Sequence, residues 1–297
     1  YPGRSGPAFY PGRSGPAFYP GRSGPAMAGP REVSNRHLIL VPLVTGDGIT
    51  ETSAGRGLGN MLATLRSSGS VAEVVILSDG PVPGSLSKTA AKFCARVVDT
   101  LDAYGQLYNN VAMEGEPLGL LWAFRYLRGL PGEGAAYGAV MIAAPEAVVF
   151  QADPFEHMHS KARLIFLASG SEPFVKEEVF LDSMQACFSP EDIDSMAEYP
   201  PVSSAALVGH PQQIVGLLGG LLRRAHKQYG LFPTSCDRHT AAQHLTAIAY
   251  SGELEATLQL NDGSENFAAD LKGWPLSYVE DAPGGKGARD SSGAPVS

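Results

Sequence analysis

The chain has 297 residues, of which 44% are hydrophobic and 18% are charged, and its formal net charge at pH 7 is −8. This apolar content is enough for one large α/β domain or two small ones. The acidic balance argues against a nucleic-acid surface, which needs clustered Lys and Arg. No apolar run reaches the roughly 18 residues that a membrane span requires. We therefore expect neither a nucleic-acid partner nor a transmembrane segment.

The two ends of the chain have low-complexity sequences. Residues 1–26 consist of the nine-residue repeat YPGRSGPAF, present twice and followed by YPGRSGPA. Such a Gly- and Pro-rich repeat cannot pack a core, so we interpret it as a disordered linker, a processed leader or an expression artefact, with an interaction tail as the functional alternative. Residues 283–297 are expected to be a disordered tail, which leaves 27–282 as the folded domain.

No signal peptide is evident, because nothing near the start joins a basic segment to an apolar one. The sequence therefore leaves the compartment open between the cytoplasm and the interior of an organelle, and we expect a soluble protein.

Strands and helices alternate along the first half of the predicted domain. Apolar runs of strand length predict buried strands at 37–44, 71–80 and 137–150. Apolar residues that recur three and four positions apart predict helices at 57–69, 88–104 and 118–130. Apolar strands that alternate with helices favour parallel pairing, with both faces of the sheet covered.

The second half is more irregular. Short strands are predicted at 163–170 and 203–209, and a helix from Pro211 is expected to be weakened at its Gly219-Gly220 pair. A last helix is predicted with Asp237 as its N-cap and Gly252 as its stop. The predicted fold class is α/β, with a mixed, mainly parallel sheet and helices on both faces. Ligands of such sheets bind at the carboxyl ends of the strands.

Two loops at predicted strand ends are candidates for nucleotide binding. Gly55, Gly57 and Gly59 stand in the first loop, ahead of the predicted helix. They could bring backbone N–H groups against a phosphate, or they could form a flexible connection, since the loop matches neither GxGxxG nor a Walker P-loop. Asp79 ends the second strand, where it could accept a hydrogen bond from a ribose or a base. Asp-Gly is also a common turn.

The stretch QADPFEHMHS offers possible metal ligands. Asp153-Pro154 is typical of a turn whose aspartate caps the next element. His157 and His159 are two positions apart, so they could share one ion only in an extended segment, and a turn with surface histidines is the favoured reading. No GxSxG elbow is present, and no hydrolase triad can be argued from the sequence.

Taken in order, these segments resemble the nucleotide-diphospho-sugar transferase family, whose members have the GT-A fold. The resemblance covers roughly residues 37–282, and its most specific match is FQADPF at 150–155. It is also carried, in this order, by LILVPLVTG, EVVILSDG, SSAALVG and CDRHTAAQHL followed by SGEL. The resemblance implies a GT-A-like, Rossmann-like domain of glycosyltransferase descent.

The chain departs from the family where the family holds its metal. Family members typically read Asp-x-Arg-Asp-Val-x-Phe-Gln-x-Asp-Pro-Phe. The alignment places Ala144 and Ala147 at the two aspartates and Glu146 at the arginine. The resemblance implies that those aspartates hold Mg²⁺ or Mn²⁺ against the diphosphate, where the cation neutralises the charge of the leaving group. Alanine has no donor atom, so the cation would lose its main anchor.

Two further loops depart in the same way. The usual Asn-Ser-Gly of the acceptor-side strand has become Ser203-Ser204-Ala205, and the segment GWPLSYVEDAP lacks the histidine that the family supplies there. We therefore expect a domain that has lost metal-dependent transfer and serves as a structural or assembly subunit, with no cofactor and with other protein subunits as partners.

The alternative is an active glycosyltransferase that moves a sugar from a nucleotide-diphospho-sugar to an unknown acceptor, with Mn²⁺ or Mg²⁺ as cofactor. In that case Asp237 would act in catalysis near the acceptor, and a nucleotide-sugar would be the ligand. The remaining candidates are the nucleotide-binding Thr45, Gly46, Asp47 and Asp79, and the metal- or diphosphate-binding Glu146 and Asp153.

Overall fold

A computed structural model of the chain describes ten stretches and four short strands. The stretches are 36–44, 51–78, 80, 82–100, 115–156, 164–168, 173–176, 178–185, 188–231 and 241–250, and the short strands are 256–259, 268–270, 277–278 and 288–289. All of these residues belong to one compact unit, Ser34–Ser297. Within the described stretches, no helix combines the length and apolar character needed to cross a membrane.

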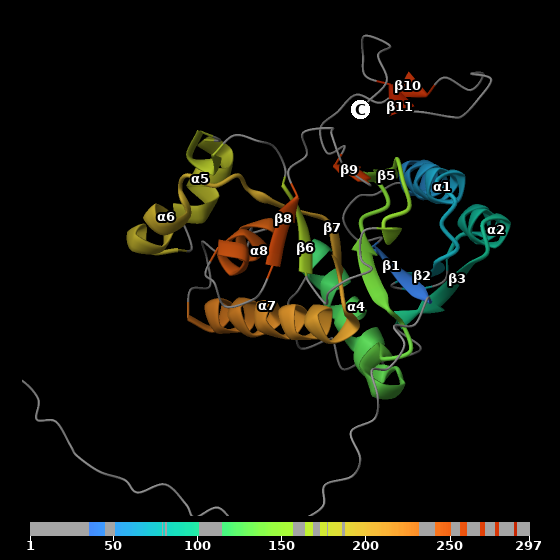
Figure 1. Ribbon diagram of the computed structural model, residues 1–297, viewed down its shortest axis with the longest axis horizontal. Helices are drawn as coiled ribbons and strands as arrows, with labels where there is room; N and C mark the ends of the chain where they lie inside the picture. Colours follow the sequence, from blue (N-terminus) through green and yellow to red (C-terminus); the bar gives the residue numbers. More distant parts are fainter. Residues whose placement is uncertain are drawn as a thin grey trace, which may run out of the picture. The chain divides into compact units, whose positions relative to one another are not determined.

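A seven-stranded sheet forms the centre of this unit (Figure 1). Its strands are β1 (His37–Leu43), β2 (Glu73–Ser78), β3 (Ala95–Asp99), β4 (Ala139–Ala143), β6 (Leu164–Ala168), β7 (Val202–Gly209) and β8 (Ala256–Gln259). The order is β3-β2-β1-β4-β7-β6-β8, and β7 is antiparallel to both of its neighbours while the other pairs are parallel. The predicted mixed, mainly parallel sheet is therefore confirmed.

Four other strands pair outside the main sheet. They are β5 (Val148–Phe150) with β9 (Ala268–Asp270), and β10 (Ser277–Tyr278) with β11 (Ala288–Arg289).

Helices cover both faces of the main sheet, as predicted (Figure 1). On one face lie α1 (Glu51–Ser67) and α2 (Gly84–Lys92), and on the other lie α4 (Gly115–Gly129), α7 (Pro211–Leu231) and α8 (Ala241–Tyr250). The helices α5 (Glu178–Gln185) and α6 (Pro190–Met196) pack against α8. Two short 3₁₀ turns, η2 (Pro131–Gly134) and η4 (Phe174–Lys176), complete these elements.

The continuous apolar character of the central strands follows from burial on both faces. In β1, Ile39, Val41 and Leu43 belong to the apolar cluster beneath α1. Leu38 and Leu40 belong to the cluster beneath α4 and α7. Successive side chains of a strand point to opposite faces, so a strand between two helical layers needs apolar residues at every position.

The predicted helix over 88–104 is wrong. The chain forms the short helix α2 and then the strand β3, which pairs with β2. Cys94, between them, has a φ of 55°, which ends the helix because L-residues rarely continue a right-handed helix from that conformation. Val97 and Val98 then pack against opposite apolar clusters, which is the two-residue period of a strand.

The predicted single strand over 137–150 is also wrong, because the chain turns after β4. The Ala147 amide donates a hydrogen bond to the Ala144 carbonyl at 3.2 Å, and this turn separates β4 from β5. The strand β5 then runs beside α1, where the Phe150 amide donates to the Thr64 hydroxyl at 3.1 Å. The alanines therefore stand in a turn that leaves the main sheet.

The helix α7 runs from 211 to 231 through the Gly219-Gly220 pair, where a weak point was expected. A Cβ atom added at Gly219 would lie 3.5 Å from the ring of Phe124 on α4. The small residue thus suits the close approach of α4 to α7.

Candidate functional site

The strand order places the candidate site at the carboxyl edge of the sheet. From β1 the chain continues through α1 to β2 on one side of β1, while β4 lies on its other side. Open α/β sheets bind ligands outside the carboxyl ends of the strands at such a switch point. Residues 45–50, which follow β1, lie outside the described residues. The described part of the site is therefore the β4–β5 turn with its neighbours from α1 and β7.

Alanines line this part of the edge. Ala143 ends β4 and is fully buried, and in the sheet it lies opposite Ala206 of β7. The amide of Ala144 donates to the carbonyl of Ala205 at 2.8 Å. Ala147 is 5% exposed and belongs to the apolar cluster beneath α1. The methyl groups of these residues offer no oxygen ligand for a divalent cation.

The helix α1 closes onto this turn through a glycine. A Cβ atom added at Gly57 would lie 2.9 Å from the Cα of Glu146 and 3.0 Å from the carbonyl oxygen of Pro145. Gly55 and Gly59 also lie inside α1, facing Leu86 and Thr89 of α2. The expected glycine-rich loop ahead of the helix is therefore wrong, both as a phosphate-binding loop and as a flexible connection. The glycines lie inside the helix, where they allow neighbouring segments to pack closely against it.

The two carboxylates proposed to meet at a metal lie at opposite ends of β5. Glu146 is exposed in the turn at the carboxyl edge, beside Gly57. Asp153 accepts a hydrogen bond from the Phe155 amide at 3.1 Å. The ring of Phe155 stacks on His37, the first residue of β1, with centroids 4.5 Å apart.

His37 marks the amino edge of the sheet, so the structure does not bring Glu146 and Asp153 together. The aspartate of FQADPF shapes a turn, and both phenylalanines of this motif are buried in the core, Phe150 at 5% exposure and Phe155 at 1%. In this chain the most specific element of the resemblance therefore serves packing.

Several candidate residues lie outside the described residues and stay predictions. They are the nucleotide candidates Thr45, Gly46, Asp47 and Asp79, the catalytic candidate Asp237, and the histidines His157 and His159. Among the residues that are described, no group of three or more His, Cys, Asp or Glu side chains is placed to hold a metal ion. Among the described residues beyond β4, Glu146 offers an exposed carboxylate, whereas a divalent cation ordinarily takes about six or more oxygen ligands.

The first residues of β7 adjoin the same edge. Ser203 is 2% exposed, and its hydroxyl accepts a hydrogen bond from the Ala205 amide at 3.0 Å. The amide of Val202 donates to the Thr246 hydroxyl of α8 at 2.9 Å. The Ser203 hydroxyl is thus engaged in local structure, and Ser204 is the partly exposed member of the pair.

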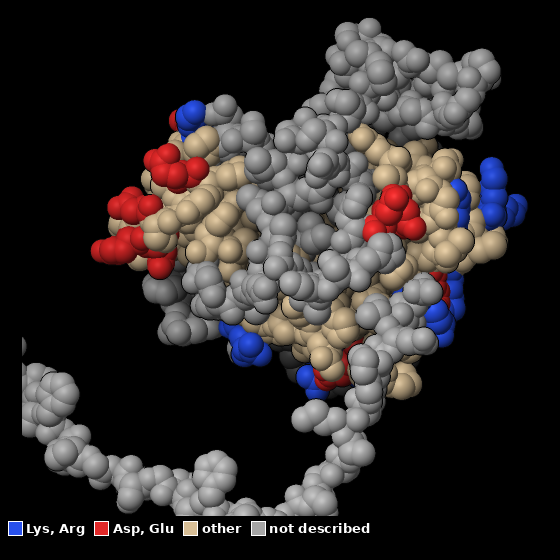
Figure 2. Space-filling model, in the orientation of Figure 1, with Lys and Arg blue, Asp and Glu red and all other residues tan. Residues whose placement is uncertain are grey.

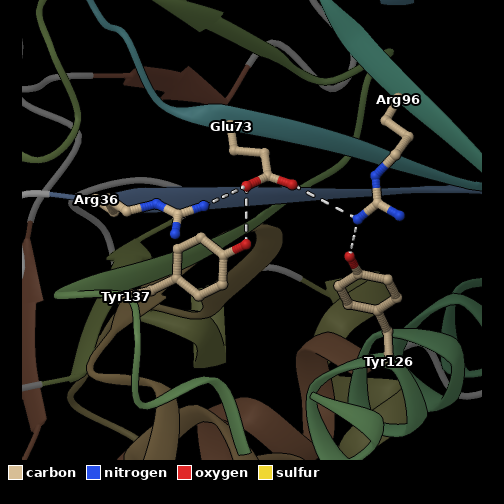
Figure 3. A network of polar contacts seen from close by, with 5 residues as sticks. All are labelled: Arg36, Glu73, Arg96, Tyr126 and Tyr137. Carbon is tan, nitrogen blue, oxygen red and sulfur yellow. Dashed lines mark hydrogen bonds and ion pairs between the residues drawn. The ribbon is translucent and has the colours of Figure 1, made fainter. Parts of the chain in front are cut away.

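A polar network that the sequence analysis missed lies at the amino edge (Figure 3). At its centre is Glu73, the first residue of β2, which accepts a hydrogen bond from the Tyr137 hydroxyl at 2.8 Å. The same carboxylate forms ion pairs with Arg36 at 3.4 Å and with Arg96 at 3.5 Å. Arg96 also donates to the Tyr126 hydroxyl of α4. The network thus joins α4 to the amino-terminal ends of β1, β2, β3 and β4.

The electrostatics of the network favour neutral tyrosines. Burial raises the pKa of Tyr137 to about 12, helped by its hydrogen bond to Glu73. Burial also raises the pKa of Tyr126, against the lowering effect of Arg96. Both hydroxyls therefore keep their protons at neutral pH, and Tyr137 remains a donor to Glu73. The position at the amino edge and the mutual pairing indicate a structural network.

No sequence signal pointed to this network, because its members are not neighbours along the chain. Tyr137 and Glu73 are 64 positions apart, and Arg36 and Glu73 are 37 apart. Arg36, Glu73, Arg96 and Tyr137 are ordinary charged or aromatic residues near the starts of strands, and Tyr126 lies on α4, so only the folded arrangement brings them together.

No protein-family model matches the sequence, and no curated protein matches it. Among solved structures, the chain is similar in fold to mouse xyloside xylosyltransferase 1 in its apo form, with a TM-score of 0.49, 13% identity, and coverage of 75% of this chain and 85% of that chain. It is also similar to core-mannan synthase A from Aspergillus fumigatus in its Mn/GDP form, with a TM-score of 0.42, 13% identity, and coverage of 76% and 72%.

The similarity is one of fold alone, and the fold class rests on the strand order and the layers of the sheet itself.

Proposed function

We propose that this chain is a GT-A-like glycosyltransferase domain that has lost metal-dependent sugar transfer and serves as a structural or assembly subunit of a larger complex. The observation that supports the loss is the turn after β4, where Ala144 and Ala147 stand at the expected ligand positions. A cation-dependent transferase needs oxygen ligands there, because the cation neutralises the charge that develops on the departing diphosphate.

Burial makes these positions part of the core. Ala147 is 5% exposed and packs in one cluster with Ala143 and Leu58. A carboxylate at this position would be taken out of water without a partner, which costs several kcal/mol unless a cation compensates it. The alanine therefore stabilises the domain at the site where an aspartate would serve catalysis.

The surface of α5 and α6 supports a role in assembly. Val175 of η4 and Val179 of α5 are apolar side chains that are 36% and 85% exposed. Acidic side chains gather over the same two helices (Figure 2). The described and exposed members are Glu178, Asp182, Glu191, Asp192, Asp194 and Glu198. A partner with basic groups around an apolar contact would complement this surface.

One observation favours the alternative of an active transferase. Glu146 is exposed at the carboxyl edge, beside Gly57 of α1. In that alternative Glu146 would take the place of the missing aspartates, and Mn²⁺ or Mg²⁺ would be bound together with a nucleotide-sugar.

Calorimetric titration of UDP and GDP into the full chain, with and without Mn²⁺, tests the proposal. We expect no binding that depends on Mn²⁺ with either nucleotide. Metal-dependent binding tighter than about 1 mM, or roughly 4 kcal/mol, would contradict the proposal. If the variant Glu146→Gln then abolished that binding, the active alternative would be established, whereas unchanged binding would place the ligands elsewhere on the chain.

A further inference from the structure

A stacked pair of tyrosines lies beside the part of the sheet that contains β6 and β7, where α8 covers one face. Tyr199 follows α6, and Tyr250 is the last residue of α8. Their ring centroids are 4.5 Å apart and the rings are inclined by 15°. The Tyr250 hydroxyl donates to the carbonyl of Pro200 at 2.8 Å, which ties this ring to the residue that follows Tyr199.

The pair stands at the same edge as the candidate site. Tyr199 precedes Val202, the first residue of β7, by three positions, and Val202 lies opposite Ala168, the last residue of β6. Both β4 and β6 are antiparallel to β7, so they point the same way and end at the same edge. Tyr199 is therefore at the carboxyl edge, on the side that the resemblance assigns to the acceptor.

The support beneath the pair is rigid. The α8 residues Gln243 and Thr246 hydrogen-bond to Ser183 of α5 at 2.8 Å and to the Val202 amide at 2.9 Å. Tyr250 packs against a buried cluster that includes Met184, Ile193, Met196 and Ala247. A ring held in this way loses little conformational freedom when a ligand stacks on it.

Among the described residues, four large hydrophobic side chains are exposed. Tyr199 is the aromatic one of these and is 49% exposed. Tyr250 covers one face of its ring, which leaves the rest of the ring open to a ligand. The face of an aromatic ring carries negative charge density, which attracts the C–H groups on the apolar face of a sugar ring. The hydroxyl at the ring edge can donate to or accept from a sugar hydroxyl.

The negative charge around Tyr199 favours neutral saccharides over anionic ligands. Glu198 is adjacent and exposed, and the acidic side chains of α5 and α6 belong to the same part of the molecule. Such a field disfavours an anionic ligand, including a nucleotide diphosphate, and leaves a neutral saccharide as the suitable ligand.

We propose that Tyr199, backed by Tyr250, is a stacking platform for one sugar ring of a neutral oligosaccharide. The inference rests on the proposed glycosyltransferase descent and names the ligand class of that fold's acceptor half. It does not require that transfer has been lost. In this account the chain holds a saccharide at the carboxyl edge of the sheet. Ala144 and Ala147 stand at that edge, at the positions where the family has its cation ligands.

The test titrates hexasaccharides of xylose, of mannose and of glucose into the full chain, followed by saturation-transfer NMR and by calorimetry. We expect at least one hexasaccharide to bind at millimolar concentration. Tyr199→Ala and Tyr199→Leu should both weaken that binding about five- to tenfold, the size expected for loss of one aromatic stack. Tyr199→Phe should keep the affinity within about twofold, because the ring face remains.

Val71→Ala is the matched control, since Val71 is an exposed apolar side chain ahead of β2 and away from α5 and α6, and it should leave the affinity unchanged. Thermal unfolding of each variant shows that the fold is intact. Absence of binding with all three hexasaccharides, or equal binding by wild type and Tyr199→Leu, would overturn the inference. Mn²⁺-dependent nucleotide binding would contradict the proposed function and leave this inference standing, so the two failures are distinguishable.

Discussion

The two edges of the main sheet differ in chemistry. At the amino edge, Glu73 gathers two arginines and a tyrosine into a paired network. At the carboxyl edge beyond β4, where ligands of such sheets bind, the described turn holds Ala143, Ala144 and Ala147 together with one exposed carboxylate, that of Glu146. Polar side chains that pair with one another indicate structure, and a site needs groups left available for a ligand.

The segment from Glu146 to Phe155 connects the two edges, and the contrast between them is clearest there. It begins at the exposed Glu146 and ends where Phe155 stacks on His37. We expect Phe155→Ala to lower the free energy of unfolding by about 3–5 kcal/mol, because a fully buried aromatic ring leaves a cavity. Urea unfolding measures this. Val71→Ala, at an 89% exposed position, should change stability by less than about 0.5 kcal/mol, and a similar small loss for Phe155→Ala would refute the structural role of the motif.

The packing of α1 on the β4–β5 turn gives the next largest effect. In an ordinary helix Gly→Ala stabilises by up to about 1 kcal/mol. Gly57→Ala should instead destabilise by about 1–3 kcal/mol, since its Cβ would meet the backbone of Pro145 and Glu146. Gly59→Ala is the matched control, because its Cβ would meet only the Thr89 side chain at 3.8 Å. If Gly57→Ala and Gly59→Ala changed the thermal stability equally, the close approach of α1 to the β4–β5 turn would be contradicted.

At the amino edge, Glu73→Gln keeps the shape of the side chain and removes its charge. We expect a loss of about 1 kcal/mol, because the partners Arg36 and Arg96 are more than half exposed and water screens their ion pairs. Urea unfolding at low and moderate salt should show a smaller difference at moderate salt. A loss as large as that of Phe155→Ala would mean that the network is a main source of stability.

The last expected effect is the pH dependence from Tyr137, which is confined to alkaline pH. Its pKa is about 12 in the folded chain and 10.0 in the unfolded chain. The unfolded state therefore loses this proton first, so its contribution to stability is complete below pH 10 and decreases as the pH rises from 10 to 12. Tyr137→Phe should flatten the stability profile over this interval. A profile identical to that of the wild type would show that Tyr137 is not the group responsible.

Much of the fold could be predicted from local patterns. The apolar runs located β1 and β2, and helical spacing located α4 and α7. The helix expected over 88–104 failed because Phe93, Val97 and Val98 satisfy a helical spacing, while a positive φ at Cys94 and pairing with β2 decide for a strand. Pairing is a long-range contact, and local periodicity does not report it.

For the candidate site, the alignment on FQADPF puts Ala144 and Ala147 at the ligand positions of the family, and this stays a prediction. The alignment did not show that Asp153 follows β5 to the far edge of the sheet, because that depends on the turn after Ala143. Nor did it show the Tyr199–Tyr250 stack, whose members are brought together by the packing of α6 against α8.

The central claim is that the edge beyond β4 does not hold a divalent cation. Electron paramagnetic resonance of Mn²⁺ tests it most directly, because free Mn²⁺ gives a sharp signal that is lost on binding. With the full chain in excess and GDP or UDP added last, the account predicts no more loss of signal than the nucleotide alone produces. Stoichiometric loss of the free signal in the presence of the chain, restored by Glu146→Gln, would contradict it.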